Sequence, residues 1–199
     1  SPGFDAVCWA ARGGVANVFR EDGESPAIAP QAFGDYNVGH MLATGIVSAL
    51  FNRTRTGKGE KVVTNLYAGA IWGGNIGICA TQFGAPYPKS RKHVPNPFNN
   101  TYRTYDDKWI YICMPQYDKY YPMMMGLFGH EDQIENPDTN NLTSLKASGK
   151  NVEVIDWLEK AFAKKTFDEW MAIFKENEVP AQKCFRYTDV VKDEEAYDN

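Results

Sequence analysis

The sequence predicts a mixed protein in which an α/β part is followed by a smaller α+β part, and three features support this fold class. Helical patterns alternate with one short β-rich segment in residues 5–83. A proline-rich stretch, residues 84–97, then breaks every regular element. After it, two β-rich runs that favour a hairpin precede four helical segments. With 199 residues, the chain can form one large or two small domains that bury a sizeable core.

The first part should be mainly helical. Residues 5–19 are rich in Ala, Gly and Val and should begin with a helix, and residues 21–26 have the composition of a turn. Apolar residues recur at helical spacing in residues 37–51, and Gly57 suits the end of this helix. Residues 61–66 are expected to form a short strand. Residues 67–83 are expected to form a second, buried helix, although they contain four glycines.

The second part should contain a hairpin and several helices. Residues 84–97 are interpreted as a linker, and the hairpin is expected in residues 100–113 around Asp106-Asp107. Helices are expected at 117–128, 141–148, 152–164 and 167–177, and the last of these begins with a capping box from Thr166 to Glu169. Residues 179–184 should be extended, and Thr188-Asp189 should begin a final short helix.

Charge and composition exclude several classes of protein. The net charge of −4 provides no electrostatic footprint for nucleic acid. No apolar run approaches the length of a membrane span, and a secretory signal is not recognisable, so a soluble cytoplasmic protein is expected. The four cysteines and three histidines are scattered. Buried free thiols are therefore expected, and a transition-metal site is not.

Asp35 is the most informative candidate for chemistry. It follows Gly34 where the long helix is expected to begin. A carboxylate at a helix N-terminus is kept ionised by the helix dipole and the free N–H groups, and carboxylates can act as nucleophiles toward activated acyl groups. Asp is also among the preferred N-cap residues. On the residues alone, the simple cap is the favoured interpretation.

Two further groups of residues have both a functional and a structural interpretation. A basic cluster in the linker could contact the phosphates of a nucleotide-bearing cofactor, although a solvated loop is favoured; it comprises Lys89, Arg91, Lys92 and His93. An aromatic group could line an acyl pocket, although core packing is favoured; it comprises Trp109, Tyr111, Tyr117, Tyr120 and Tyr121.

Several stretches, in order along the chain, resemble one enzyme family. They are Pro2-Gly3-Phe4-Asp5, Arg12-Gly13-Gly14, Gly34-Asp35 with Gly39, residues 45–50, residues 53–62, the hairpin and Val179-Pro180-Ala181. In these stretches the sequence resembles the class III CoA-transferases, also called the CaiB/BaiF or formyl-CoA transferase family. The resemblance covers nearly the whole chain and is most specific in its central block.

The resemblance implies an acyl-CoA:carboxylate CoA-transferase in which Asp35 is the catalytic nucleophile. In this family the aspartate forms a mixed anhydride with the acyl group and then an aspartyl-CoA thioester. A coenzyme A thioester is the substrate, and no cofactor is bound permanently. As candidate CoA- or substrate-binding residues we take Gly34, Lys89, Arg91, Val94 and Asn96. Neither nucleic acid nor a membrane is expected as a partner.

The resemblance also implies a domain organisation. Family members are homodimers of interlocked chains, and each chain has a large Rossmann-like domain and a small α+β domain. Residues 1–83 would form the C-terminal part of the large domain, 84–100 a linker, 101–185 the small domain and 186–199 the start of the return segment. The chain is interpreted as a fragment without the N-terminal half, where the family has most of its CoA contacts. This fragment alone is therefore expected to be inactive.

Two other functions stay open. The family includes 2-methylacyl-CoA racemases, which use acid/base chemistry at the α-carbon, but the Gly34-Asp35-Tyr36-Asn37 context is closer to transferases that serve 2-hydroxyacyl-CoA dehydration. Residues 94–100 contain no glycine. The glycine-rich loop of formyl-CoA transferases, and their formyl/oxalate substrate pair, are therefore not implied. A non-catalytic α+β interaction module, with Asp35 as a cap, is the second alternative.

Overall fold

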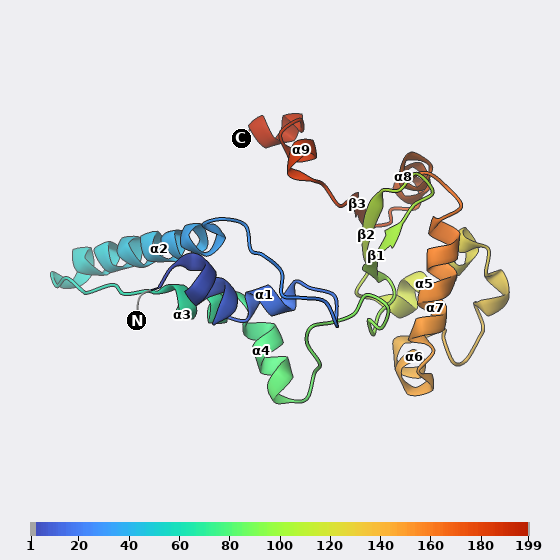
Figure 1. The fold of residues 1–199 in the computed structure, drawn as a ribbon, viewed down its shortest axis with the longest axis horizontal. Helices are drawn as coiled ribbons and strands as arrows, with labels where there is room; N and C mark the ends of the chain where they lie inside the picture. The colour runs from blue at the N-terminus through green and yellow to red at the C-terminus, as the bar shows by residue number, and fades with distance from the viewer. Residues whose placement is uncertain (1–2, 199) are drawn as a thin grey trace. The chain divides into compact units, whose positions relative to one another are not determined.

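A computed structural model describes residues 3–198, which form two compact units (Figure 1). The first unit extends to Ser90 and the second begins at Arg91. Each unit has its own core. The expected mixture of helices and a small sheet is confirmed, because the second unit contains a three-stranded sheet surrounded by helices. Within residues 3–198, no helix combines the length and the apolar character needed to cross a membrane.

All the regular elements in the described residues of the first unit are helices. It contains a π-helix η1 (Ala6–Ala11) and the α-helices α1 (Val15–Val18), α2 (Phe33–Thr56), α3 (Leu66–Gly73) and α4 (Asn75–Gln82). Helices η1, α2 and α3 pack against one another (Figure 1). The long helix α2 ends as predicted. Gly57 has a left-handed backbone with φ of 71°, and its N–H donates to the carbonyl of Arg53.

Two predictions for the first unit are wrong. Residues 61–66 do not form a strand, because a strand needs a neighbouring strand for its backbone hydrogen bonds and residues 3–90 contain none. Instead, Asn65 caps α3 by accepting a hydrogen bond from the N–H of Ala68. Residues 67–83 are divided into two helices at Gly74. These helices are largely exposed rather than buried, as Trp72 at 70% and Ile76 at 82% show.

The core of the first unit is small. Its buried apolar residues are Trp9, Ala10, Val38 and Ala70. Glycine permits this close packing. A Cβ added at Gly69 of α3 would lie 2.4 Å from a methyl group of Val38 on α2. The close contact between α2 and α3 therefore depends on having glycine, which lacks a side chain, at position 69.

The sheet of the second unit contains β1 (Asn99–Arg103), β2 (Trp109–Cys113) and β3 (Ala181–Lys183), in that order and all antiparallel. The predicted hairpin is confirmed, with Tyr102 opposite Ile110. Its turn lacks glycine, and Asp107 adopts the left-handed conformation with φ of 64° instead. Asp tolerates this conformation better than most residues, because its short side chain can hydrogen-bond locally.

The helices of the second unit agree closely with the predicted ranges. They are α5 (Tyr117–Phe128), α6 (Leu142–Ser148), α7 (Asn151–Phe162), α8 (Phe167–Glu176) and α9 (Tyr187–Val190), with the short 3₁₀ helices η2 (Glu131–Gln133) and η3 (Glu194–Tyr197). The predicted capping box is confirmed, because Thr166 and Glu169 satisfy each other's backbone N–H groups. Strong local signals therefore set these boundaries.

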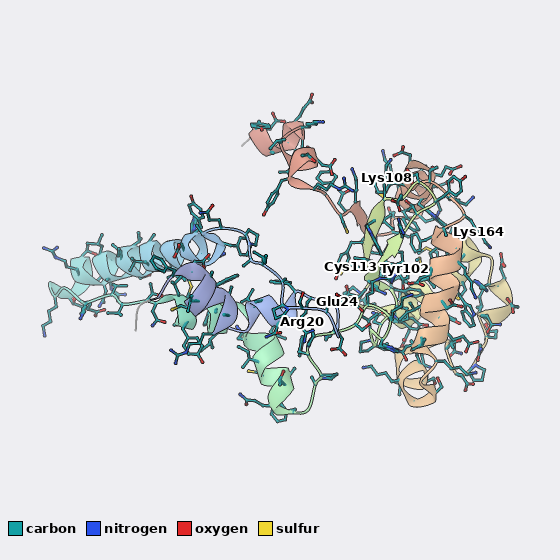
Figure 2. The ribbon with its side chains drawn as sticks, in the orientation of Figure 1. Arg20, Glu24, Tyr102, Lys108, Cys113 and Lys164 are labelled. Atoms are coloured by element: carbon teal, nitrogen blue, oxygen red, sulfur yellow. The ribbon has the colours of Figure 1, made fainter. Side chains whose placement is uncertain are left out.

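The inner face of the sheet packs on the helices and forms a much larger core than that of the first unit. Tyr102, labelled in Figure 2, is fully buried, stacks on Phe162 of α7 at 4.8 Å and donates a hydrogen bond to the carbonyl of Pro97. Ile110 and Ile112 of β2 point to the same side. This alternation is typical of a sheet with one buried face.

Candidate functional site

Asp35 is the third residue of α2 and is exposed. The N-cap position belongs to Ala32, whose side chain cannot accept a hydrogen bond. The interpretation of Asp35 as a simple N-cap is therefore wrong, because the helix begins two residues before it. Asp35 is nevertheless in the first turn, where the positive end of the helix dipole favours a negative charge.

The carboxylate of Asp35 is chemically accessible. No residue between 3 and 198 donates a hydrogen bond to it, and the side chain reaches solvent. Its neighbours along the helix bond elsewhere: the amide of Asn37 donates to the carbonyl of Phe33, and Nδ1 of His40 lies 2.8 Å from the carbonyl oxygen of Tyr36. An ionised carboxylate that is neither paired nor buried can attack an activated acyl carbon.

Gly34 is buried beneath the first helical segment. A Cβ added to it would lie 2.2 Å from Oδ1 of Asp5 and 2.3 Å from Cγ of Trp9. Both distances are far too short for real contacts. Only glycine therefore allows the start of α2 to approach η1 this closely. The position of Asp35 depends on this contact, since the two residues are adjacent.

A cavity of about 570 Å³ lies beside α2 in the first unit. Its walls are mostly apolar and glycine-rich, and α2 contributes Phe33, Asn37 and Met41. These three residues recur every four positions and so share one face of the helix. Asp35 is two positions away, about 200° around the axis. The carboxylate and the cavity are therefore on different sides of α2, and Asp35 is not among the residues that line it.

The basic candidates of the linker differ in their surroundings. Lys89, in the first unit, is exposed, and its Nζ lies 5.0 Å from the ring centre of Tyr87. Arg91 belongs to the second unit, where both terminal nitrogens lie 2.6 Å from Oε1 of Glu159. The guanidinium also stacks over the ring of Trp109 at 5.0 Å. Arg91 is thus held by contacts that fix its orientation.

Val94 and Asn96 take part in the structure of the second unit. Val94 packs against the core, and its carbonyl accepts a hydrogen bond from Asn151. The amide nitrogen of Asn96 donates to the carbonyl of Met114 at 3.0 Å, and its oxygen accepts from the N–H of Phe98. Gly34, Asp35 and Lys89 therefore belong to the first unit, and Arg91, Val94 and Asn96 to the second.

The aromatic group is divided between core and surface. Tyr117 and Tyr121 are buried as predicted, and burial raises the pKa of both phenols. Trp109 and Tyr111 instead lie on the outer face of the sheet, at 36% and 46% exposed. Cys113, labelled in Figure 2, is on the same strand and is also exposed.

The expectation of buried thiols is wrong for the described residues. Cys79, Cys113 and Cys184 are exposed, and Cys8 is half-buried. Cys113 is exposed because the side chains of β2 alternate between the two faces of the sheet and those at odd positions point outward.

Asp5 is a further residue of interest, which sequence reasoning did not single out as a candidate site residue. Asp5 is 9% exposed and touches the residue next to Asp35. A signal for it does exist in the sequence, because it is the single charged residue in the apolar run of residues 3–11. A lone charge in such a run is rarely buried without a specific role.

Comparison with known proteins identifies relatives over the whole chain. A family model described as CoA-transferase family III matches residues 1–199. A cinnamoyl-CoA:phenyllactate CoA-transferase of Clostridium sporogenes is 36% identical over 201 residues, which cover all of this chain and 48% of that protein. An (R)-2-hydroxy-4-methylpentanoate CoA-transferase of Clostridioides difficile is 35% identical over 198 residues, covering all of this chain and 49% of that protein.

A solved structure has the same fold. The protein Rv3272 of Mycobacterium tuberculosis superimposes with a TM-score of 0.80 at 25% identity, and the match covers all of this chain and 51% of that one. The chain thus spans about half the length of the curated relatives it matches.

Proposed function

The chain belongs to CoA-transferase family III, and from this premise we propose that the full-length protein is an acyl-CoA:carboxylate CoA-transferase with Asp35 as its nucleophile. The observation that carries the proposal is the similarity over the entire chain to two proteins named as CoA-transferases. The accessible carboxylate of Asp35, in the first turn of α2, supports the choice of residue.

The proposed reaction begins with attack by a carboxylate oxygen of Asp35 on the thioester carbonyl carbon. The C–S bond breaks, CoA leaves as a thiolate, and a mixed anhydride links Asp35 to the acyl group. The thiolate then attacks the Asp35 carbonyl of the anhydride, which releases the donor acid and leaves an aspartyl-CoA thioester.

The second half of the reaction returns CoA to a new acid. The acceptor carboxylate attacks the aspartyl thioester and expels the thiolate. The thiolate then attacks the acceptor carbonyl of the new anhydride, and free Asp35 is restored. Atoms and charge balance without an oxidant, a metal or a permanently bound cofactor.

The relatives suggest the class of substrate. Their names refer to phenyllactate and to 2-hydroxy-4-methylpentanoate, which are both 2-hydroxy acids with an apolar side chain. We propose that this protein also transfers CoA to a 2-hydroxy acid of that type. The racemase alternative has weaker support, because the two relatives at 35–36% identity are both CoA-transferases.

The organisation of the full-length protein is part of the same proposal. Residues 1–83 belong to a Rossmann-like large domain, residues 101–185 form the small domain, and residues 186–199 begin the return to the large domain. Gly34, Lys89, Arg91, Val94 and Asn96 contribute to CoA or substrate binding. The protein acts in the cytoplasm as a homodimer, which size-exclusion chromatography with light scattering can test.

The decisive experiment replaces Asp35 in the full-length protein. Asp35→Asn and Asp35→Ala should each lower CoA transfer by about 1,000-fold or more, because the nucleophile is lost. Incubating the wild type with acyl-CoA and hydroxylamine should convert Asp35 to a hydroxamate, which peptide mass spectrometry detects. Asp22→Asn is a matched control, since Asp22 is also an exposed aspartate of the first unit.

Near-normal turnover by Asp35→Asn would refute the assignment of the nucleophile. The alternative is a non-catalytic interaction module. In that case the wild type would transfer no CoA, and no hydroxamate would form at Asp35.

A further inference from the structure

Gly39 is a glycine in the interior of α2 that no packing contact explains. The helix contains two other glycines, and both are explained by close contacts. A Cβ added at Gly34 or Gly45 would lie 2.2 or 2.7 Å from a side-chain atom of another segment. At Gly39, in contrast, nothing in residues 3–198 outside the adjoining helix backbone lies within 4 Å of an added Cβ. Because glycine destabilises a helix interior relative to alanine, its presence at position 39 calls for another reason.

Gly39 lies on the same side of α2 as Asp35. The two residues are four positions apart, and such positions are neighbours on a helix surface, with Cβ positions about 5–6 Å from each other. Both residues are exposed. Val38, which is buried in the core of the first unit, points to another side of the helix, about 100° around the axis from Gly39. The side that carries Asp35 and Gly39 is therefore not the side that packs in this core.

A side chain at position 39 would cover the surface beside Asp35. In an α-helix the Cα–Cβ bonds tilt toward the N-terminus, so a residue covers the surface over the turn that precedes it. On this side of α2, the turn that precedes Gly39 is the turn that carries Asp35. With glycine at position 39 this surface stays bare. An acyl thioester that approaches Asp35 along this side of the helix then meets backbone at Gly39 rather than a side chain.

The next residue on this side of α2 is apolar. Leu42 lies seven positions after Asp35, about two helical turns along the axis, and its side chain is 37% exposed. The bare surface at Gly39 is thus bordered by a carboxylate toward the N-terminus and by an apolar side chain toward the C-terminus. This arrangement suits a 2-hydroxyacyl group, whose reacting carbonyl must reach Asp35 and whose apolar tail gains from leaving water. Two relatives are CoA-transferases named for acids of that kind.

We propose that Gly39 is a specificity-determining residue, which leaves room beside Asp35 for the acyl group of the CoA thioester. The apolar tail of this acyl group lies over Gly39 and against Leu42. The inference rests on the proposed function and deepens it by assigning the place of the acyl group. Gly39 takes no part in making or breaking bonds. A side chain at position 39 should therefore exclude large acyl groups more strongly than small ones.

The test is a series of side chains of increasing size at position 39 of the full-length enzyme. Gly39→Ala and Gly39→Leu introduce residues of high helix propensity into open space, so neither should lower the temperature of thermal unfolding. Each variant is assayed with the CoA thioesters of 2-hydroxypropanoate, 2-hydroxy-4-methylpentanoate and phenyllactate. These substrates share the reacting group and differ in the size of the tail. The quantity compared is kcat/KM for each larger thioester divided by kcat/KM for the smallest.

The expected result is a loss that grows with the size of both the side chain and the acyl group. Relative to the wild type, this ratio should fall about tenfold in Gly39→Ala and about 100-fold in Gly39→Leu, because a misfit of one or a few carbon atoms in an apolar site has effects of this size. Hydroxylamine trapping of Asp35 in a single turnover should show the same trend. Thr44→Leu is the matched control and should leave the ratio unchanged, since Thr44 is an exposed residue of α2 about 180° around the axis from Asp35.

Several outcomes would overturn the proposal. One is an unchanged ratio in both variants, and another is an equal loss of activity for all three thioesters. An equal loss together with a lower unfolding temperature would show that another part of the full-length protein packs on Gly39. Should Gly39→Leu fail to fold, the ratio measured for Gly39→Ala still decides the matter. A wild type that transfers no CoA would instead refute the proposed function, whereas an active wild type with variants that do not discriminate by size refutes only the role of Gly39.

Discussion

Ala32 and Gly34 constrain the backbone on the N-terminal side of Asp35. Ala32 has a left-handed conformation with φ of 58°, which costs a non-glycine residue about 1–2 kcal/mol. Gly34 is fixed by its contact with Asp5 and Trp9. Strained backbone of this kind is often found at functional sites, where the surrounding structure must hold it. The path of the chain into α2 is therefore determined by packing against η1 rather than by helix propensity.

Gly34→Ala tests this constraint. The new Cβ would collide with a carboxyl oxygen and an indole ring, and overpacking of this kind typically costs about 1–3 kcal/mol. We expect thermal unfolding of the full-length protein at a lower temperature, together with loss of CoA transfer. Gly39→Ala is the matched control on the same helix, because nothing lies within 4 Å of its added Cβ. It should be neutral or stabilising, since alanine is the better helix former. Equal behaviour of the two variants would contradict the packing argument.

At the scale of elements, the sequence predicted those parts of the fold that carry their own signals. Helices α5 and α8 have periodic apolar faces, and the capping box at Thr166 marks where α8 begins. Residues 61–66 have the composition of a strand but form none, because strand formation depends on a partner strand, which β-propensity does not reveal. The sequence places the N-cap of α2 at Asp35, three residues beyond the observed N-cap Ala32, because no sequence rule favours alanine as a left-handed N-cap.

The candidate site was predictable to a similar extent. Its glycine and its place near a helix start single out Asp35 as a candidate, but these local features alone favour a cap, and its proposed role as nucleophile comes from the family resemblance. The contact between Asp5 and Gly34 is long-range, and spacing along the chain gives no indication of it. The outward orientation of Trp109 and Tyr111 follows from the register of a sheet whose third strand lies some seventy residues downstream of β2.

Asp106 joins two elements of the second unit, the hairpin and α8. Its Oδ1 accepts hydrogen bonds from the hydroxyl of Thr104 and from the N–H of Phe167, and its Oδ2 lies 3.0 Å from Nζ of Lys108. The hydrogen bond from Thr104 is the largest cause of a strongly lowered pKa, followed by those from Lys108 and Phe167. The charged form of Asp106 therefore stabilises the folded state.

This linkage predicts a pH dependence of stability. Because the pKa of Asp106 is lower in the folded state than its ordinary value of 3.8, its contribution is complete above that value and is lost as the pH falls toward the folded-state pKa. Asp106→Asn should be less stable than the wild type at neutral pH, and the gap should narrow at about pH 3. Thermal unfolding of the wild type and Asp106→Asn at neutral pH and at about pH 3 measures this difference in stability. Asp107→Asn, which alters the ion pair with Arg103 in the same turn, is the control. If the difference in stability between the wild type and Asp106→Asn did not depend on pH, the charged form of Asp106 would not be what stabilises the folded state.

At the scale of the whole molecule, the two units differ in how well each supports itself. The second unit buries several aromatic side chains completely, among them Tyr102, Phe162 and Trp170, and its core includes residues from the sheet and four helices. In the first unit only Gly34 and Val38 of the long helix α2 are buried. Large apolar side chains such as Ile28 and Phe83 are at least 90% exposed there. Burial of apolar surface is the main source of stability, so the first unit should be much less stable by itself.

The two units should therefore behave differently when they are expressed separately. Residues 91–199 should unfold cooperatively on heating, with near-ultraviolet circular dichroism and dispersed NMR signals that indicate a fixed core. Residues 1–90 should show weak, non-cooperative melting, because four buried apolar residues cannot offset the entropy of ordering five helices. Phe162→Ala, which removes a ring that contacts Tyr102, Phe128, Trp170 and Phe174, should cost the isolated second unit about 3–5 kcal/mol. A cooperative transition of residues 1–90 at a similar temperature would show that exposed apolar side chains are a poor guide to the stability of this unit.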